Sequence, residues 1–168
     1  MFDLNYIALF KDMSPEMAVF LISMIPVAEL RASIPIALTV YNLDILTTLF
    51  YAILGNIIPM FFILYLIDPV SKFLMKHFTI FNKFFTWLFK RTRIKFEGKY
   101  AKYGSIALVL FVAIPLPITG SWTGALAAFL FRIPRQRAAI LIISGIIIAA
   151  LAVTFITKTA WGAFLLFT

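Results

Sequence analysis

The chain of 168 residues contains no cysteine, a single histidine and few charged side chains. Without cysteine it can form no disulfide, no thiolate metal site and no cysteine nucleophile, and His77 alone cannot build a multi-histidine metal site. Only 13% of its residues are charged and 63% are hydrophobic, whereas a soluble domain has about 25% charged residues. A soluble globular protein and a disordered chain are therefore both excluded, and lipid surrounds most of this protein.

Motifs of common enzymatic chemistry are also lacking. The sequence has no glycine-rich phosphate-binding loop, no nucleophile elbow and no zinc-type spacing, and no paired carboxylates lie near its apolar segments. We therefore expect a protein that is not an enzyme and uses no cofactor or metal. Residues 1–12 have no basic region ahead of an apolar core, so we expect no cleaved signal peptide there.

Negative charge is scarce as well, because seven Asp and Glu stand against fifteen Lys and Arg, a formal net charge of +8. Such an excess can indicate a nucleic-acid-binding protein. In a membrane protein it indicates cytoplasmic loops and contact with anionic headgroups. We expect membrane lipids as partners and no nucleic acid.

Long apolar runs are what the sequence has in abundance. Residues 45–67 and 138–157 are free of charge over 23 and 20 residues, and at about 1.5 Å per residue each can cross a hydrocarbon core of about 30 Å. Both are predicted transmembrane helices. Prolines interrupt two further runs, residues 17–40 and 105–131, and should unwind them. Each is then an interrupted spanning helix or a re-entrant hairpin.

The positions of the basic residues favour re-entrant hairpins. The linker of residues 69–103 carries nine basic residues and one acid, so we expect it on the cytoplasmic side. Arg132, Arg135 and Arg137 follow the second interrupted run, and they share the linker's side only if that run returns to the side from which it entered. Twelve of the fifteen basic residues are then cytoplasmic.

This topology predicts an all-α polytopic membrane protein with a single membrane domain, residues 1–168, built from two inverted repeats. The first repeat spans residues 17–67 and the second spans residues 105–157, each as a re-entrant hairpin followed by a transmembrane helix. Gly55 and Gly145, 90 residues apart, are a faint trace of the repetition. Inverted repeats with broken helices are typical of secondary transporters.

The linker should form an amphipathic helix. Its apolar residues recur at steps of three and four and its lysines recur every seven, so one face is apolar and another is basic. The pattern predicts a helix lying in the cytoplasmic interface, with a third spanning helix as the alternative. The positions are Leu74, Phe78, Phe81, Phe85 and Leu88 on the apolar face and Lys76, Lys83 and Lys90 on the basic face, ahead of a basic cluster at residues 90–95.

Glu29 and Arg31 are the only charged residues in the first interrupted run. A charge at the centre of a bilayer costs about 2.5–3.5 kcal/mol on insertion scales, so both need compensation. Either they are functional, with Arg31 binding an anionic headgroup and Glu29 linked to protons or substrate, or they form a structural ion pair. Pro26 and Pro35 are expected at the tip of the hairpin.

The second interrupted run contains the string PLPITGSWTG at residues 115–124. Its tip is expected at Pro115, Pro117, Gly120, Trp122 and Gly124. Hydroxyl groups at membrane depth, available to freed backbone carbonyls or to a ligand, come from Thr119, Ser121 and Thr123. The alternative is small-residue packing around a structural turn. Arg132 and Arg135 are expected to contact headgroups from the loop that follows.

The string ELRASIP at residues 29–35, together with residues 115–124, resembles the small multi-drug export protein family. That family is distantly similar to the DedA (VTT, SNARE-associated) membrane proteins, and the resemblance covers residues 17–157. It implies paired re-entrant hairpins in inverted repeats and a prokaryotic plasma (inner) membrane. For the DedA relatives it implies transport of lipid carriers such as polyprenyl phosphates, or lipid scrambling, often linked to the proton-motive force.

The sequence departs from the DedA pattern in two places. DedA proteins carry two acids in the first hairpin, whereas here Glu29 stands alone. Their second hairpin carries an arginine near its prolines, whereas here Arg132 and Arg135 follow the apolar run. In this chain Arg31 would then take over the phosphate role.

Three functions are compatible with these observations. The first is a transporter that translocates an anionic amphiphile or lipid-linked phosphate, with Arg31 on the headgroup and Glu29 coupling protons or gating. The second is an exporter of cationic amphiphilic drugs, with Glu29 as the cation site. The third is a membrane scaffold that transports nothing. Because 168 residues make a small transporter, we expect a homo-oligomer.

Overall fold

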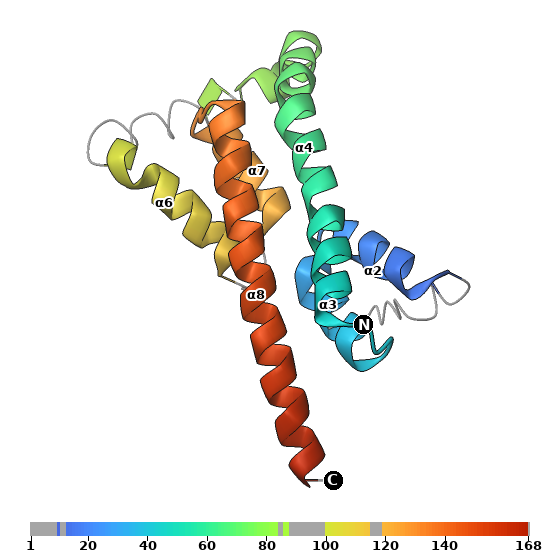
Figure 1. The fold of residues 1–168 in the computed structure, drawn as a ribbon. Coiled ribbons are helices and arrows are strands. Elements are labelled where there is room, and N and C mark those ends of the chain that lie inside the picture. Colours follow the sequence, from blue (N-terminus) through green and yellow to red (C-terminus); the bar gives the residue numbers. More distant parts are fainter. Residues whose placement is uncertain (1–9, 11–12, 84–85, 88–99, 115–118, 168) are drawn as a thin grey trace. The chain divides into compact units, whose positions relative to one another are not determined.

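The structure is a computed structural model, and it describes residues 10, 13–83, 86–87, 100–114 and 119–167. All regular secondary structure in this part of the chain is helical, which confirms the expected all-α class. The helices, in chain order, are α2 (Pro15–Met24), α3 (Glu29–Thr39), α4 (Ile45–His77), α6 (Tyr100–Ala113), α7 (Ser121–Leu130) and α8 (Arg135–Phe167) (Figure 1).

Two of these helices are long and apolar enough to cross a membrane: α4, and α8 from Arg135 to Ala163. Both have 33 residues and contain the runs predicted to span, but they extend beyond them. The α4 helix continues past residue 67 to His77, and α8 begins at Arg135 and continues past residue 157 to Phe167. The hydropathy of the sequence shows where an apolar run ends. The helix itself can continue further, because its backbone hydrogen bonds do not depend on apolar side chains. Lys76 and His77 in the last turn of α4 also complement the helix dipole.

The first interrupted run forms two helices, but only one of its prolines lies at the break. The chain turns between α2 and α3 at residues 25–28, which include Pro26 and the strongly exposed Val27 (83%). Pro35 lies inside α3, away from the tip at which it was expected. Membrane helices tolerate an internal proline because neighbouring groups compensate for the lost backbone bond, and α4 likewise continues through Pro59 and Pro69.

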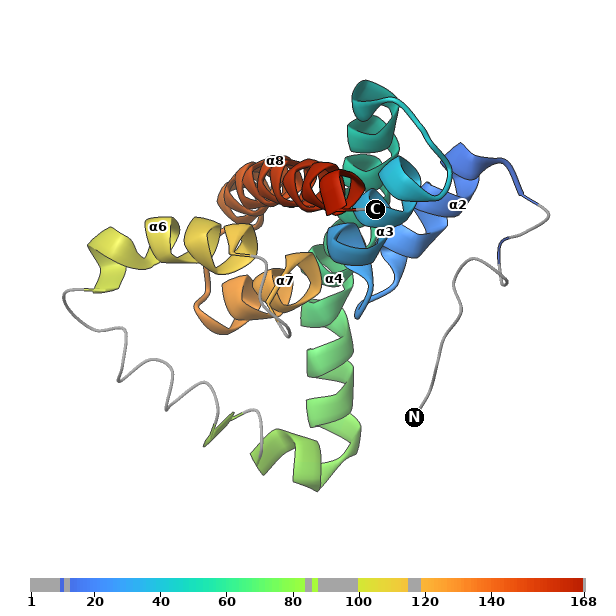
Figure 2. The ribbon, with the colours of Figure 1, turned by 90° about the horizontal axis from the view of Figure 1, so that it is seen from below.

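By its internal contacts the chain divides into two compact units. The first unit is Met1–Ile58 with Ile147–Thr168, and it contains α2, α3 and parts of both long helices. Within it α2 and α3 lie side by side (Figures 1 and 2). Their contact includes a buried hydrogen bond of 2.6 Å from the Ser23 hydroxyl to the Ser33 hydroxyl. The apolar core of this unit includes the fully buried residues Ala18, Val19, Ile22, Ile34 and Ala37.

Close packing brings α2 onto α4 in the first unit. A methyl group added at Gly55 would overlap the carbonyl oxygen of Phe20 and lie 2.8 Å from Cβ of Ser23. Only glycine therefore allows the two helix backbones to approach this closely.

At the start of α4, Thr47 donates a backbone hydrogen bond of 2.9 Å to the Asp44 carboxylate. Hydrogen bonds from Thr47 lower the pKa of the Asp44 carboxyl below its ordinary value.

The second unit, Pro59–Ile146, also contains a packed pair of helices beside a long helix. Here α6 packs on α7, and α8 approaches α6 through Gly145, where an added methyl group would lie 2.7 Å from Cβ of Val112 and 2.9 Å from the carbonyl oxygen of Val109. Gly124 of α7 also faces Val112. Each unit therefore has a helical pair whose first helix packs on a glycine of a long helix.

Helical structure resumes after His77, at residues 79–83 and 86–87. Phe78 and Phe81 are exposed there, and their rings contact edge to face with centroids 5.9 Å apart. The described part of the linker therefore presents aromatic side chains on its surface. Other residues of the predicted amphipathic pattern lie outside the described residues, namely Phe85, Leu88, Lys90 and the basic cluster at residues 90–95.

Candidate functional site

Glu29 and Arg31 occupy the first turn of α3, directly after the break in the first interrupted run. The Glu29 side chain is buried, with 4% of the residue exposed, and its backbone amide donates to the carbonyl of Ile25 at 3.0 Å. Arg31 is half-buried, and the opposite charges of the two side chains attract each other. The first unit thus holds an acid inside its core and a partly accessible base beside it.

The backbone of Glu29 is strained. Its φ of 44° lies in the left-handed region, where a side chain costs about 1–2 kcal/mol because Cβ approaches the following carbonyl oxygen. Such strain persists only where the surrounding structure enforces it, and it concentrates at functional positions. Here it accompanies the turn that places the carboxyl group of Glu29 in the core of the first unit.

Further polar groups are buried in the same unit. Asn56 and Thr48 on α4 are almost fully buried, and the Thr48 hydroxyl has no hydrogen-bond partner within the described structure. Ser23 and Ser33 satisfy each other across the α2–α3 pair. The sequence analysis did not single out Thr48 or the two serines. These residues could have been found from the sequence, because each is a polar residue in an otherwise apolar run.

Two hydroxyl groups of the second interrupted run lie within hydrogen-bond distance of carbonyl oxygens of the same run. Thr119 donates to the carbonyl of Ile114 at 2.8 Å, and Thr123 is 3.4 Å from the carbonyl of Gly120. Gly120 caps α7 with a φ of 141°, a conformation that favours glycine. Ser121 is fully buried at the first position of α7. The Thr119 hydroxyl therefore bonds to a carbonyl at the end of α6, whereas the Gly120 carbonyl near Thr123 already accepts a hydrogen bond of 2.8 Å from the Gly124 amide. Pro115 and Pro117 lie outside the described residues.

Trp122 and Gly124 were expected to form part of the same tip. The indole nitrogen of Trp122 is buried without a hydrogen-bond partner in the described structure. Gly124 lies where an added methyl group would be 2.6 Å from a methyl carbon of Val112. Both residues belong to the second unit, whereas Glu29 and Arg31 belong to the first.

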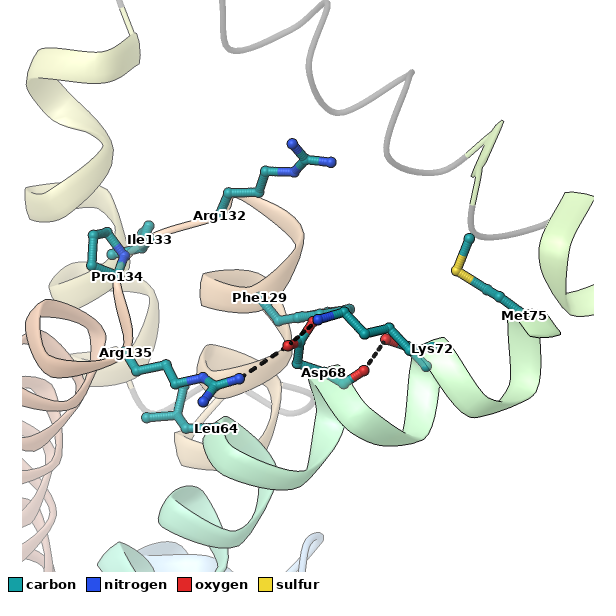
Figure 3. Close-up of a pocket in the computed structure, with 10 residues that line it drawn as sticks. Leu64, Asp68, Lys72, Met75, Phe129, Arg132, Ile133, Pro134 and Arg135 are labelled. Carbon is teal, nitrogen blue, oxygen red and sulfur yellow. Dashed lines mark hydrogen bonds and ion pairs between the residues drawn. The ribbon is translucent and has the colours of Figure 1, made fainter.

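A cavity of about 540 Å³ lies within the second unit, and four of its ten described lining residues are charged. Its walls come from the second half of α4, the end of α7 and the start of α8. One carboxylate oxygen of Asp68 contacts both Lys72 Nζ, at 2.9 Å, and Arg135 Nη2, at 3.1 Å. Figure 3 shows these two cations directed at the Asp68 carboxylate, with Arg132 on the loop between α7 and α8.

Arg132 takes an unusual place in that loop. After the end of α7, the Ile133 amide donates to the carbonyl of Ala128 at 2.9 Å and the Arg132 amide donates to that of Phe129 at 3.1 Å. This pair of bonds is a Schellman motif, whose left-handed residue is usually glycine. Here it is Arg132, with a φ of 53°. Pro134 follows and prevents α7 from continuing.

Arg135 is positioned by two neighbours on α4. Besides its ion pair with Asp68, its guanidinium lies 5.8 Å from the centre of the Tyr65 ring, within the range of a cation–π contact.

The sequence analysis assigned Arg132 and Arg135 to headgroup contact but did not include Asp68 or Lys72. Their signal was weak, because they are simply the first charges after the apolar run of α4. No group of three metal-ligating side chains occurs among the described residues.

A comparison with known protein families shows to which family the chain belongs. The family described as "Putative small multi-drug export protein" matches residues 29–152, about three quarters of the length. The chain belongs to this family. No curated protein and no solved structure matches it.

Membership in the small multi-drug export family agrees with the two apolar helices, and together they identify a membrane protein. The matched region begins at Glu29 and ends within α8. It contains the Glu29–Arg31 pair, the second interrupted run and the charged cavity of the second unit. The α2 helix lies ahead of it.

Proposed function

We propose that this protein translocates an anionic amphiphile, of the lipid-linked phosphate type, across the bilayer. The observation that carries the proposal is the unequal burial of the charge pair in the first unit. Glu29 is buried, whereas Arg31 beside it is partly exposed. A substrate that reached this pair would meet the guanidinium first, and guanidinium matches phosphate in geometry as well as in charge.

The other polar groups take supporting roles in this proposal. Glu29 would gate the site or couple it to protons, since its charge offsets that of Arg31 only while the carboxyl group is ionised. Thr119, Ser121 and Thr123 would supply polar contacts, because a hydroxyl oxygen that donates to a backbone carbonyl still accepts a hydrogen bond. No enzymatic step is part of the proposal.

The proposed architecture is that of two inverted repeats with re-entrant hairpins, as in DedA-type proteins. Its support is the recurrence of features at a spacing of 90 residues. Gly55 and Gly145 each contact the first helix of a helical pair. Asn42 and Arg132 each have a left-handed backbone, at φ of 51° and 53°, shortly before a long helix. We further propose a prokaryotic plasma membrane, a cytoplasmic linker at residues 69–103 and a homo-oligomer.

A second candidate is an exporter of cationic amphiphilic compounds. The family description favours it, and so does the burial of Glu29 in an apolar unit, because an acid in such a place can bind a desolvated cation. In this alternative Arg31 would neutralise Glu29 at rest and the substrate would displace it.

The experiment for the leading proposal is reconstitution of the full chain in liposomes with a fluorescent polyprenyl phosphate. Arg31→Ala should reduce its translocation by about tenfold or more, because one charge-assisted contact is worth about 1.5–3 kcal/mol. Arg31→Lys should recover only part of the rate, because an ammonium group cannot form the bidentate contact.

The matched control removes a basic residue elsewhere. Lys158 lies on α8 and is exposed, so Lys158→Ala should leave translocation unchanged. Unchanged translocation in Arg31→Ala, with the protein correctly inserted, would rule out the proposed role of Arg31.

A further inference from the structure

The walls of the charged cavity come from two groups of residues that lie far apart in the sequence. Five of its ten described lining residues belong to α4, and the other five belong to the end of α7, the following loop and the start of α8. The ion pair of 3.1 Å between Asp68 and Arg135 joins the two groups (Figure 3). A cavity of about 540 Å³ departs from the close packing of protein interiors, so the two groups do not fill the space between them.

The close backbone contacts of the two long helices lie away from this ion pair. Gly55 packs against α2 at a point 13 residues before Asp68, and Gly145 packs against α6 at a point 10 residues after Arg135. At about 1.5 Å per residue, these contacts are about 20 Å and about 15 Å along each helix from the pair. Beside the cavity, α4 and α8 are thus connected through long side chains rather than through packed backbones.

The ion pair is accessible to water. The side chain of Asp68 is 34% exposed and that of Arg135 is 46% exposed. Exposed ion pairs contribute little net stability, because water solvates the separated charges and salt screens their attraction. Such a pair is too weak to hold a fold together. It is strong enough to bias an equilibrium between two arrangements of similar free energy.

The surroundings of the pair suit both a joined and a separated state. In the joined state Arg135 contacts α4 twice, through Asp68 and through the Tyr65 ring. In the separated state Lys72, which contacts the same Asp68 oxygen at 2.9 Å from one turn along α4, keeps that carboxylate paired. Arg135 precedes the charge-free run of α8 by three residues, so water and lipid headgroups can solvate its released guanidinium.

We propose that Arg135, Asp68 and Tyr65 form a reversible clasp between the start of α8 and α4, and that its release opens the cavity toward the lipid headgroups. When the clasp is closed, the guanidinium bridges the two groups of lining residues. When it is open, Asp68 stays paired with Lys72 while the start of α8 moves away from α4. The clasp goes beyond the proposed function, because its two states can be measured in a protein that transports nothing.

The competing explanation is a static link, in which the ion pair joins α4 to α8 at one fixed distance. The two explanations differ when one member of the pair loses its charge. A clasp then shifts toward a second, longer distance between the helices. A static link keeps a single distance, or the protein loses stability without populating a second one.

The test measures this distance by double electron–electron resonance in the full-length protein, in phosphatidylcholine nanodiscs. Because the chain has no cysteine, Val70→Cys and Gln136→Cys carry the two spin labels. Both positions are exposed, and neither lines the cavity. We expect a main short distance and a minor longer one. Asp68→Asn and Arg135→Gln should each raise the ratio of long to short by about two- to fivefold.

Lys72→Gln is the matched control, because it removes a charge beside the same carboxylate and leaves the contact with Arg135 in place. It should not raise the proportion of the longer distance. Arg135→Lys should keep most of the short distance, since an ion pair requires only the charge. Salt tests the labelled protein without further substitution. Raising it from about 0.1 M to about 1 M shortens the Debye length from about 10 Å to about 3 Å and should increase the longer distance.

These results decide between the clasp and the static link. A longer distance that grows in Asp68→Asn, in Arg135→Gln and with salt, but not in Lys72→Gln, supports the clasp. A distance distribution that neither the loss of charge nor salt changes would overturn the proposal. An equal shift in Lys72→Gln would also overturn it, because the effect would then come from general surface charge.

Discussion

The hydrogen bond between Ser23 and Ser33 joins α2 to α3 inside an apolar unit, and both hydroxyl groups are fully buried. Neither has access to water, so each depends on the other. A buried polar group that loses its partner costs about 1–3 kcal/mol, whereas removal of both partners can be nearly neutral. The bond therefore matters less for its own energy than for the penalty that follows when half of it is removed.

Ser33→Ala should lower the stability of the first unit by about 1–3 kcal/mol, because it leaves the Ser23 hydroxyl unpaired. The double variant Ser23→Ala/Ser33→Ala should recover much of that loss. Thermal unfolding in detergent measures both. Losses that simply add in the double variant would show that the two hydroxyl groups act independently, contrary to the structure.

Some residue-level features were predictable and others were not. Glu29 and Arg31 could be singled out because charges are rare in apolar runs. The burial of Glu29 beside a more accessible Arg31 could not, because it depends on which side of the turn each side chain takes. The left-handed backbones of Glu29 and Arg132 were also hidden, since glycine is the usual marker of that conformation.

At the scale of helices, two glycines set how closely the pairs approach the long helices. Gly55 of α4 contacts α2, and Gly145 of α8 contacts α6. In membranes, where lipid removes most of the hydrophobic driving force between helices, such close backbone contact is a main source of stability. The glycines are thus the residues on which the packing of each unit depends.

Gly55→Ala and Gly145→Ala should each destabilise the protein by about 1–3 kcal/mol, because the added methyl group meets backbone atoms that cannot rotate away. Gly162 is the matched control on α8, since nothing lies within 4 Å of its added methyl group. Gly162→Ala should be neutral or slightly stabilising, because alanine favours the helix. Thermal unfolding of the three variants in one detergent measures the difference, and equal effects at all three positions would contradict the packing described.

Sequence patterns predicted the helices better than their ends. The charge-free runs located α4 and α8, and Pro26 located the turn before α3. Pro35 did not break its helix, and both long helices continue beyond their apolar runs. The charged cavity could not be predicted from the sequence. Its central ion pair joins Asp68 to Arg135, which are 67 residues apart, and sequence spacing does not reveal such a contact.

For the whole molecule, the placement of charge predicts the topology. Asn42 precedes α4 and Gln136 lies in the first turn of α8, and both are exposed. Inverted hairpins place these two positions on opposite sides of the membrane. Because the chain has no cysteine, Asn42→Cys and Gln136→Cys each introduce a single label. An impermeant thiol reagent should reach them from opposite faces, and labelling from the same face would refute the inverted arrangement.

The central claim concerns what the membrane protein moves, and parallel readouts in one liposome preparation test it most directly. The wild type, Arg31→Ala and Glu29→Gln are each assayed for translocation of a labelled polyprenyl phosphate and for efflux of a cationic dye. The account predicts that the wild type translocates the phosphate lipid and that Arg31→Ala reduces this activity by about tenfold or more. Dye efflux that Glu29→Gln removes and Arg31→Ala spares, without lipid translocation, would contradict it in favour of a cation exporter. The absence of both activities would contradict it in favour of a scaffold.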